Sequence, residues 1–558
     1  MKKNHFLCLL AVVLMSSLSQ GQKRKNDPVV SQAAPIAMAP KLVVGIVVDQ
    51  MRYDYLTRFW DQYGDDGFKR LVGEGFNCKN HHYNYAPTST GPGHASVFTG
   101  TTPATHGVIG NNWFDKQTGK DVYCAGDDNY TSVGSSSDAG QMSPHRMRTT
   151  TVTDELRLHT QKRGKVIGIA LKDRGAILPA GHTANAAYWF EGGTLGKWIT
   201  SSYYMEALPQ WVVDFNNSGQ ADAYKKPWNT LRPVHTYAES GTDANAYEGM
   251  FKGETTSAFP HDLPQLWEGN GHYEILKTTP YGNSLTLDFA LAAVEAEELG
   301  KDLITDFLTL SFSSTDYVGH FFGVNSKEIE DTYIRLDLEL ARLLGTLDEK
   351  VGKGEYTIFL TADHAALDVP AYLKDSKIPA GYLDMKGIRE RFAGYLQYKF
   401  GTTDVVRSHS NGQIFLDHKI LANLDIDIQE AQEDIARELL DYPGIGQTYT
   451  AHQMWSTDFT QGIPYLLQKG YNQKRSGDVL TVPDPAFVSS GTTGSTHGSA
   501  QIYDTHVPLL LFGKGIKQGS TVHRTEIPDI APTISVLLGI AFPNGTIGKP
   551  IAEVLEFK

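Results

Sequence analysis

The sequence has little cysteine, no excess of basic residues and no long apolar run. Only 3 of its 558 residues are cysteine, and none shows the close spacing of a thiolate zinc site. The net charge of −13 argues against binding of nucleic acid, which needs a basic surface, so no such partner is expected. An acidic surface also gives no long-range attraction for phosphate esters, so any anion binding must be local to a site.

The N-terminus has the features of a signal peptide. Two lysines precede the apolar run Phe6–Met15, and the small residues up to Gly21 fit a cleavage site. The run is too short for a permanent membrane anchor. Residues 1–21 are therefore predicted to be a signal peptide and residues 22–39 a flexible lead-in, in a periplasmic or secreted protein.

Two cysteines, Cys78 and Cys124, remain after removal of this peptide. In an oxidising compartment they form either one disulfide or two buried, unpaired thiols. The sequence does not choose between these, because a disulfide depends on geometry.

Continuous apolar runs alternate with helical patterns along the rest of the chain. Such runs are typical of strands that are buried on both faces of a parallel sheet. The expected strands are Leu42–Asp49, Lys165–Leu171, Leu303–Ser313, Tyr356–Thr361 and Val507–Phe512. Helices are expected over Ser284–Leu299 and Ser326–Leu347, the second capped by Asn325 with Glu328. The pattern predicts an α/β fold with a mostly parallel central sheet and helices on both faces.

The domain organisation is predicted as one catalytic domain over residues 40–558. Residues from about 183 to 283 are rich in Tyr, Trp, Asn, Gly and Pro and are interpreted as an inserted, irregular lobe. A second irregular region is expected from about 366 to 490, with a helical patch at Ile428–Leu440.

Acidic and histidine side chains follow several of the expected strands. Asp49 ends the first, Asp316 follows the third, and Asp363 with His364 follows the fourth. Open α/β sheets bind ligands at the carboxyl ends of their strands, so we expect these side chains to converge.

The types and spacing of these residues suit divalent cations. Asp316 and His320 lie four residues apart and share one face of a helical turn. With the late His497, the candidate ligands are Asp49, Asp316, His320, Asp363, His364 and His497. This number exceeds what one tetrahedral zinc ion takes and suits two. Asp and His ligands favour zinc in a catalytic role, although such sites accept other divalent ions.

A hydroxyl nucleophile is expected in the segment Ala86–His94, just before a helix-like stretch. A hydroxyl at the start of a helix can meet an anion, and zinc coordination lowers its pKa. Thr88, Ser89 and Thr90 all qualify, and spacing does not choose among them. A simple helix cap is the alternative interpretation.

Lys172 and Arg174 would supply positive charge for a substrate anion. They follow the expected strand Lys165–Leu171, and residues two apart on a strand point the same way. Arg offers a planar fork for phosphate oxygens, and Lys offers a mobile point charge. Asn111 is a further, neutral donor. For all three, an ordinary solvated loop or turn is the alternative.

Together these segments resemble the alkaline phosphatase superfamily, in its phosphodiesterase/nucleotide pyrophosphatase branch, and within it the PafA-type bacterial alkaline phosphatases. The resemblance extends from about Leu42 to Lys549. The stretches that carry it are Leu42–Arg52, Pro87–Thr90 with Gly93 and His94, His106–Asn111, Leu171–His182, Ser314–His320, Ala362–His364, Ser495–Ser499 and Tyr503–Pro508.

The resemblance implies a role for each candidate residue. Thr90 would be the nucleophile and would form a covalent phosphothreonine. The ligands would be Asp49, Asp363 and His364 for the zinc ion that activates Thr90, and Asp316, His320 and His497 for the zinc ion at the leaving oxygen. Asn111, Lys172 and Arg174 would bind the nonbridging phosphate oxygens. Diesterase relatives generally lack the Lys/Arg pair, which favours a broad-specificity hydrolase of small phosphate monoesters, expected to act as a monomer.

Two other functions stay open at this point. One is a phosphodiesterase or a phosphonate/nucleotide hydrolase on the same scaffold, and the other is a non-catalytic exported zinc-binding protein. A sulfatase is disfavoured, because the nucleophile turn lacks the Cys/Ser-x-Pro-x-Arg pattern.

One residue departs from the family pattern. Ala365 stands where the family usually has Gly, and it would strain the loop if that position needs a positive φ. His94, His182 and His506 also lie in the resembling stretches and are interpreted as structural.

Overall fold

The computed structural model of the chain describes residues 39–489 and 491–556. The predicted signal peptide, and all but the last residue of the predicted lead-in, lie outside the described residues. Among those residues, no helix combines the length and apolar character that crossing a membrane requires.

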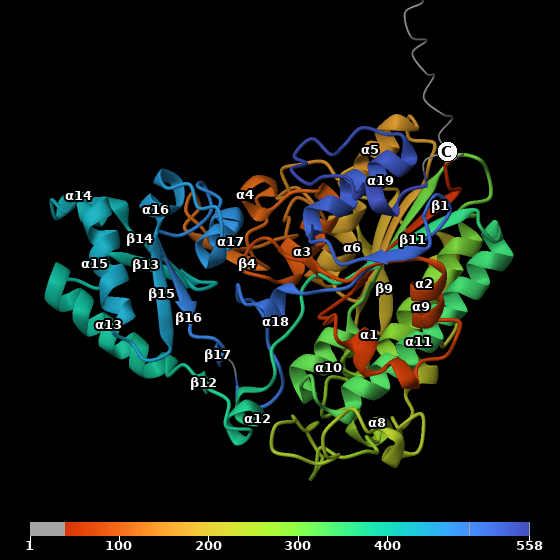
Figure 1. The fold of residues 1–558 in the computed structure, drawn as a ribbon, viewed down its shortest axis with the longest axis horizontal. Helices are drawn as coiled ribbons and strands as arrows, with labels where there is room; N and C mark the ends of the chain where they lie inside the picture. The colour runs from red at the N-terminus through yellow and green to blue at the C-terminus, as the bar shows by residue number, and fades with distance from the viewer. Residues whose placement is uncertain (1–38, 490, 557–558) are drawn as a thin grey trace, which may run out of the picture.

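A ten-stranded sheet forms the centre of the molecule (Figure 1). Its strands, in spatial order, are β19 (Gly519–Thr521), β2 (Phe76–Cys78), β18 (Leu509–Gly513), β11 (Tyr356–Thr361), β1 (Leu42–Val48), β10 (Asp306–Phe312), β7 (Val166–Ala170), β8 (Ala186–Glu191), β9 (Lys197–Ser201) and β6 (Ser132–Val133). The strands from β11 to β8 run parallel, whereas β18 and β9 pair antiparallel on either side. Each predicted strand is present in this sheet, and the predicted α/β class is confirmed.

Helices cover both faces of the sheet, so its central strands are apolar throughout. All residues of β1 and β10 are buried. The helices of one face are α3 (Thr90–Thr99), α5 (Val152–His159), α6 (Asp173–Ala180) and α19 (Ile530–Leu538). Those of the other face include α1 (Tyr55–Arg58), α2 (Phe68–Glu74), α9 (Pro280–Ala296), α10 (Ser314–Phe322) and α11 (Lys327–Leu347) (Figure 1).

The long helices agree with the predicted ones, but one cap differs. Ser326, rather than Asn325, caps α11: its hydroxyl accepts a 3.2 Å hydrogen bond from the Ile329 N–H. The Asn325 amide instead donates to Asp368 at 2.7 Å. The capping residue was therefore predicted one position too early. Cys78 and Cys124 are both buried, free thiols.

The predicted inserted lobe begins too early at residue 183. β8 and β9 belong to the central sheet, and Tyr188, Trp189 and Phe190 are buried there. An aromatic-rich composition suggested an irregular lobe, although the same side chains fill a strand that is covered on both faces. The rest of this region, residues 202–279, contains only short helices, among them α7 (Gln210–Asn217) and α8 (Leu263–Leu266).

The second region that was predicted to be irregular is an ordered lobe with its own sheet. The strands of this antiparallel sheet, in order, are β13 (Val406–Ser410), β14 (Gln413–Leu416), β16 (Val479–Pro483) and β15 (Ile445–Thr450). Two helices, α13 (Met385–Phe400) and α15 (Ile428–Leu440), contribute to a separate apolar core, and α15 is the predicted helical patch. Figure 1 shows this lobe beside the main domain, where α17 (Gly462–Gly470) contacts α4 (Pro103–His106).

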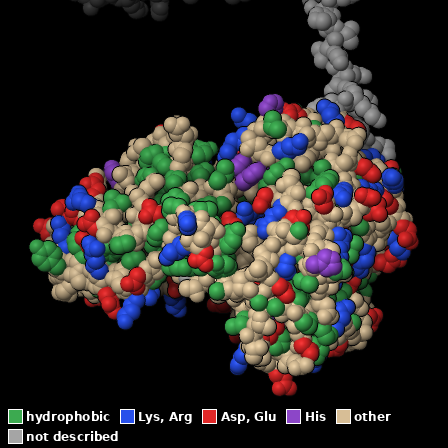
Figure 2. Space-filling view, turned by 60° about the horizontal axis from the view of Figure 1, so that its bottom comes forward, with side chains coloured by type: hydrophobic (Ala, Val, Ile, Leu, Met, Phe, Trp, Pro, Cys, Tyr) green, Lys and Arg blue, Asp and Glu red, His purple; other side chains and the backbone are tan. Residues whose placement is uncertain are grey.

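Acidic and basic side chains are interspersed over the face of the molecule that Figure 2 shows. That face carries no continuous basic surface, in keeping with the net charge of −13.

Candidate active site

The candidate metal ligands gather because three neighbouring strands end together. β1 lies between β10 and β11 in the sheet, and the three strands are parallel. Asp49 follows β1, Asp316 lies in the first turn of α10 after β10, and Asp363 with His364 follows β11. Residues that are far apart in the sequence thus meet at one edge.

One candidate cation site consists of Asp316, His320 and His497, whose ligand atoms all lie within 4.8 Å of one another. One turn of α10 places His320 Nε2 3.1 Å from Asp316 Oδ1. His497 comes from the loop after the second lobe, and its Nε2 lies 3.8 Å from the same oxygen. A helix and a distant loop therefore supply one set of ligands.

A second candidate site, formed by Asp49, Asp316 and His364, shares Asp316 with the first. His364 Nε2 lies 3.5 Å from Asp49 Oδ1 and 3.5 Å from Asp363 Oδ2. These three atoms are buried and have no hydrogen-bond partner. Buried polar atoms are nearly always paired, so a convergence of three unpaired ligand atoms fits a bound cation.

The three histidines are oriented in the same way. Each one bonds through Nδ1 to a backbone carbonyl: His320 to Ser495 at 2.8 Å, His364 to Ala365 at 3.0 Å and His497 to Thr88 at 2.9 Å. Such bonds fix the tautomer and leave Nε2 free as a metal ligand.

The electrostatics of the site follow from burial and crowding. Burial, followed by the charge of Asp49, holds the pKa of Asp363 well above its ordinary value. Burial lowers the pKa of His364 to about 3, so its ring is neutral and can bind a metal. Burial would raise the pKa of Asp316, but the charges of His320 and Lys172 hold it well below its ordinary value. These carboxylates therefore favour a nearby positive charge.

Thr90 is the first residue of α3, and its neighbour Ser89 adopts the extended backbone of an N-cap. The helix start lies directly against Asp363, since a Cβ on Gly93 would be 2.3 Å from the Asp363 carbonyl oxygen. His94 Nδ1 also approaches Asp363 Oδ2 at 3.4 Å. Thr90 therefore lies beside the candidate ligand Asp363, where a phosphate could meet both its hydroxyl and a bound cation.

Asn111 lies beside this helix start. Its side-chain oxygen accepts a 2.7 Å hydrogen bond from the Gly91 N–H. The amide NH₂ is then left to donate to another group. The side chain of Asn111 therefore lies against the helix start that holds Thr90.

Lys172 and Arg174 lie near the same centre, but not on a strand. β7 ends at Ala170, Lys172 is the N-cap of α6, and Arg174 lies within that helix. The prediction from strand alternation is therefore wrong in its reason, although both residues line one cavity of about 490 Å³ with Tyr317. Lys172 Nζ contacts Asp49 at 2.6 Å and Asp316 at 2.5 Å, so its ammonium lies between acids of both candidate sites.

Known proteins resemble this chain in sequence and in fold. The model of the family described as type I phosphodiesterase / nucleotide pyrophosphatase matches residues 43–507. The chain belongs to the type I phosphodiesterase / nucleotide pyrophosphatase family.

Three relatives match over nearly their whole length. Alkaline phosphatase PafA of Elizabethkingia meningoseptica is 43% identical over 98% of both chains. Alkaline phosphatase PhoV of Synechococcus elongatus is 44% identical over 99% of this chain and 100% of its own. A Myroides odoratus protein named calcium-transporting ATPase is 47% identical over 93% of this chain and 95% of its own. The crystal structure of PafA has a TM-score of 0.89 at 44% identity and covers 93% of this chain and 99% of its own.

Ala365, the one departure from the family pattern, has an unstrained backbone. Ala365 is buried, donates its N–H to the Asp504 carbonyl at 2.9 Å, and is not among the residues with positive φ. Alanine therefore causes no backbone strain there. His182 bonds to Asp154 and to the Met147 carbonyl, and His506 bonds to the Lys79 carbonyl and stacks on Tyr53, in keeping with structural roles.

Sequence reasoning missed two residues of the site. Gln50 donates its backbone N–H to Asp363 at 3.1 Å and its side-chain amide to Asp316 at 2.7 Å. Tyr123 accepts a 3.2 Å hydrogen bond from Arg174. The position of Gln50 directly after Asp49 was the only available signal, and Tyr123 had none.

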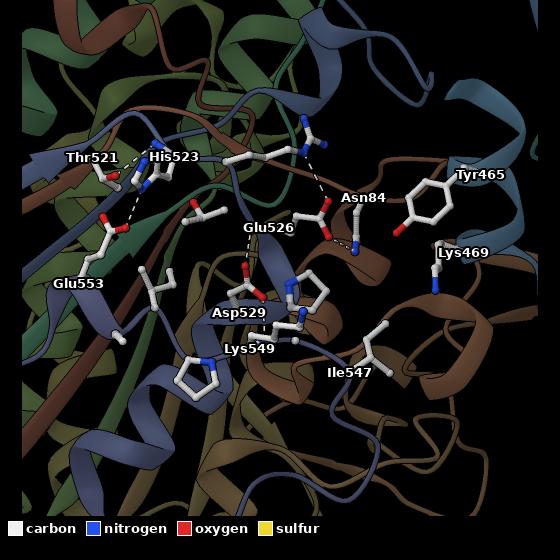
Figure 3. Close-up of a pocket in the computed structure, with 17 residues that line it drawn as sticks. Asn84, Tyr465, Lys469, Thr521, His523, Glu526, Asp529, Ile547, Lys549 and Glu553 are labelled. Atoms are coloured by element: carbon white, nitrogen blue, oxygen red, sulfur yellow. Dashed lines mark hydrogen bonds and ion pairs between the residues drawn. The ribbon is translucent and has the colours of Figure 1, made fainter. Parts of the chain in front are cut away.

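A separate cavity of about 470 Å³ shares no residue with the candidate site (Figure 3). Its acids already have partners: Asn84 donates to Glu526 at 2.8 Å, and His523 pairs with Glu553 at 2.6 Å. We therefore assign it no part in the chemistry of the family.

Proposed function

We propose that this chain is an exported alkaline phosphatase of broad specificity, which hydrolyses phosphate monoesters through a threonine nucleophile at a two-zinc site. Its likeness to PafA and PhoV over nearly the full chain supports the monoester activity. The observation that carries the chemistry is the sharing of Asp316 by two candidate cation sites, next to the helix start that holds Thr90.

The two zinc ions would be held by neighbouring sets of ligands that meet at Asp316. Asp49, Asp363 and His364 would hold one, and Asp316, His320 and His497 the other. Bound there, the two ions would lower the pKa of a hydroxyl and stabilise the negative charge of the leaving oxygen. The three unpaired buried atoms of the first set are the reason to place an ion there.

Thr90 would carry the covalent step. The Thr90 hydroxyl would give its proton to solvent as Oγ1 attacks phosphorus; the bond between phosphorus and the leaving oxygen would break, and the leaving group would take a proton from water. Water then attacks the phosphothreonine, the bond to Thr90 Oγ1 breaks, and inorganic phosphate leaves as the hydroxyl regains a proton.

Asn111, Lys172 and Arg174 would hold the nonbridging oxygens. A phosphate monoester is a dianion and a diester a monoanion, so two cationic side chains favour the monoester. Lys172 and Arg174 line one cavity, and Lys172 Nζ contacts Asp49 and Asp316, which supports placing this positive charge beside the candidate cation sites.

Trapping the phosphoenzyme tests the nucleophile. With a ³²P-labelled monoester and an acid quench, we expect label on Thr90 in the wild type and none in Thr90→Ala. Ser89→Ala, which removes the neighbouring hydroxyl, should keep the label and serves as the matched control. Full turnover by Thr90→Ala, or label on another residue, would reject the assignment.

Export is tested separately. The mature protein recovered from the periplasm or the medium should begin at Gln22, as N-terminal sequencing would show. A protein that stays in the cytoplasm with its first residues intact would contradict export without affecting the proposed chemistry.

A further inference from the structure

A β-hairpin links Asn111, a proposed phosphate ligand, to Tyr123. β4 (Asn112–Asp115) and β5 (Lys120–Tyr123) pair antiparallel, with Asn112 opposite Tyr123. Just beyond this pair, the Cys124 N–H donates to the Asn111 carbonyl at 2.8 Å. Asn111 and Tyr123 therefore lie at the same end of one small, rigid element.

That end of the hairpin contacts both α3 and α6. On one side, Asn111 accepts the 2.7 Å hydrogen bond from Gly91, next to Thr90. On the other side, the Tyr123 hydroxyl donates to Asp173 Oδ1 and accepts a 3.2 Å bond from Arg174 Nη1. The Arg174 N–H donates to the same Asp173 oxygen. Asp173, Tyr123 and Arg174 thus form a closed set of three bonds.

Within the described part of the chain, the bond to Tyr123 is the one side-chain hydrogen bond that fixes the Arg174 guanidinium. Among the residues that the structure describes, Nη1 is the one guanidinium nitrogen that donates to a protein acceptor, and Nε is buried without a partner. Arginine has many rotamers, and fixing one end of its planar fork restricts how it can meet a phosphate. The rest of the fork lies at the cavity that Lys172 and Tyr317 also line.

The Tyr123 hydroxyl is protonated, as its bonds to Asp173 and Arg174 require. Burial, followed by the charge of Asp173, holds the pKa of Tyr123 well above its ordinary value. Tyr123 therefore stays protonated, donates to the carboxylate and offers a lone pair to Arg174.

We propose that Tyr123 is a positioning residue that holds the Arg174 guanidinium for the phosphate, so that the β4–β5 hairpin sets the spacing between Asn111 and Arg174. This inference rests on the proposed role of Arg174 as a ligand of the phosphate oxygens. Tyr123 itself would contact neither the substrate nor a metal ion.

A double-mutant cycle tests the proposal on the full-length, zinc-loaded enzyme. The variants are Tyr123→Phe, Arg174→Ala and the two combined, assayed with an aryl monoester and its methyl diester. Tyr123→Phe should lower kcat/KM for the monoester about 10- to 100-fold, the effect expected for losing a bond to a charged group. The diester should lose less, because one charge fewer faces Arg174.

The combined variant separates positioning from direct contact. In the Arg174→Ala background, Tyr123→Phe should change monoester kcat/KM by less than about 2-fold, since its partner is gone. Asp173→Asn weakens the same set of bonds, so it should reproduce part of the drop in the ratio of monoester to diester kcat/KM. Tyr356→Phe is the matched control. It removes another Tyr–Asp bond (2.7 Å to Asp348) at the start of β11, the end away from the candidate site, and should leave the ratio of monoester to diester kcat/KM unchanged.

Three results would overturn the inference. They are an unchanged Tyr123→Phe enzyme, an equal loss on both substrates, and the same loss with and without Arg174. If Arg174→Ala damages the monoester reaction and Tyr123→Phe does not, the proposed function survives and only the positioning role fails. Absence of a phosphothreonine in the wild type would instead reject the proposed function.

Discussion

The side-chain amide of Gln50 donates a 2.7 Å hydrogen bond to Asp316 Oδ1, across the boundary between the two candidate cation sites. Its backbone N–H donates to Asp363 at 3.1 Å, so one residue orients an acid of each set. Gln50 has a φ of 65°, a conformation that L-residues other than Gly seldom adopt. Its amide is also packed against α10, where a Cβ on Gly319 would lie 2.0 Å from Gln50 Oε1. Packing against α10 therefore keeps Gln50 in this strained conformation, in which it can bond to Asp316 and Asp363.

Gln50→Ala should weaken zinc binding without removing a ligand. Loss of a group that orients ligands typically costs about 10- to 100-fold in metal affinity. Activity should fall at limiting zinc and recover at excess zinc, as a titration of the metal-free enzyme would show. Gln447→Ala, in β15 of the second lobe, is the control. An unchanged zinc titration would show that Gln50 only fills space.

The parts of the site that could be predicted are those that leave a recognisable pattern in the neighbouring sequence. β1, β10 and β11 are continuous apolar runs because both faces are covered, and their ends place Asp49, Asp316 and Asp363. His320 follows from the helical spacing to Asp316. His497 has no such pattern around it, because a loop near the far end of the chain brings it into hydrogen-bond contact with the Thr88 carbonyl.

The parts that could not be predicted depend on long-range packing. The bonds of Gln50 and Tyr123 join residues from separate elements, and single-sequence patterns carry no information about such pairs. The antiparallel sheet of the second lobe was missed because its strands are short and two of them, β13 and β15, are only partly buried. β8 was missed because its aromatic residues do not show the aliphatic run of the other strands.

Replacing Lys172 or Arg174 by Ala should reduce monoester hydrolysis far more than diester hydrolysis. Each side chain opposes a charge that the diester lacks, so we expect an extra loss of about 10- to 100-fold per residue for the monoester. The measurement is the ratio of kcat/KM for an aryl monoester to that for its methyl diester.

Lys277→Ala is the matched control for this prediction. Lys277 lines the same cavity but pairs with Glu274 at 2.8 Å, so it should change both substrates alike. A ratio that stays constant in Lys172→Ala and Arg174→Ala would favour the phosphodiesterase alternative on this scaffold.

Chelation should lower stability as well as activity. Removing a cation would leave Asp49 Oδ1, Asp363 Oδ2 and His364 Nε2 buried without partners. A ligand present at about 1,000 times its Kd contributes about 4 kcal/mol, so the thermal midpoint should fall with EDTA and recover with zinc. Asp363→Asn should respond much less. An unfolding curve that EDTA does not shift would reject a tightly bound ion, and reloading with manganese would test the choice of metal.

The stability of the enzyme should decrease as the pH rises from about 7 to 10, because of His261. This imidazole is buried, with Nδ1 2.7 Å from Glu254 and Nε2 3.3 Å from Glu328 in the first turn of α11. Burial alone would lower its pKa, but the bonds to both carboxylates raise it to about 9. Burial and the charge of Glu328 also raise the pKa of Glu248 to about 8.

The sign of the effect follows from these pKa values. A histidine whose pKa is higher in the folded state stabilises the fold fully below its ordinary pKa of about 6.5 and loses this contribution as the pH rises through 9. Glu248 acts in the same direction, because its folded form also holds a proton more tightly. The full contribution of His261 is on the order of 3 kcal/mol.

Urea unfolding at several pH values should therefore show a steep decline of the free energy of unfolding with pH for the wild type and a shallower one for His261→Gln. His523→Gln, at an exposed position, should keep the wild-type slope. Parallel curves for the wild type and His261→Gln would mean that this imidazole carries no proton in the fold at neutral pH.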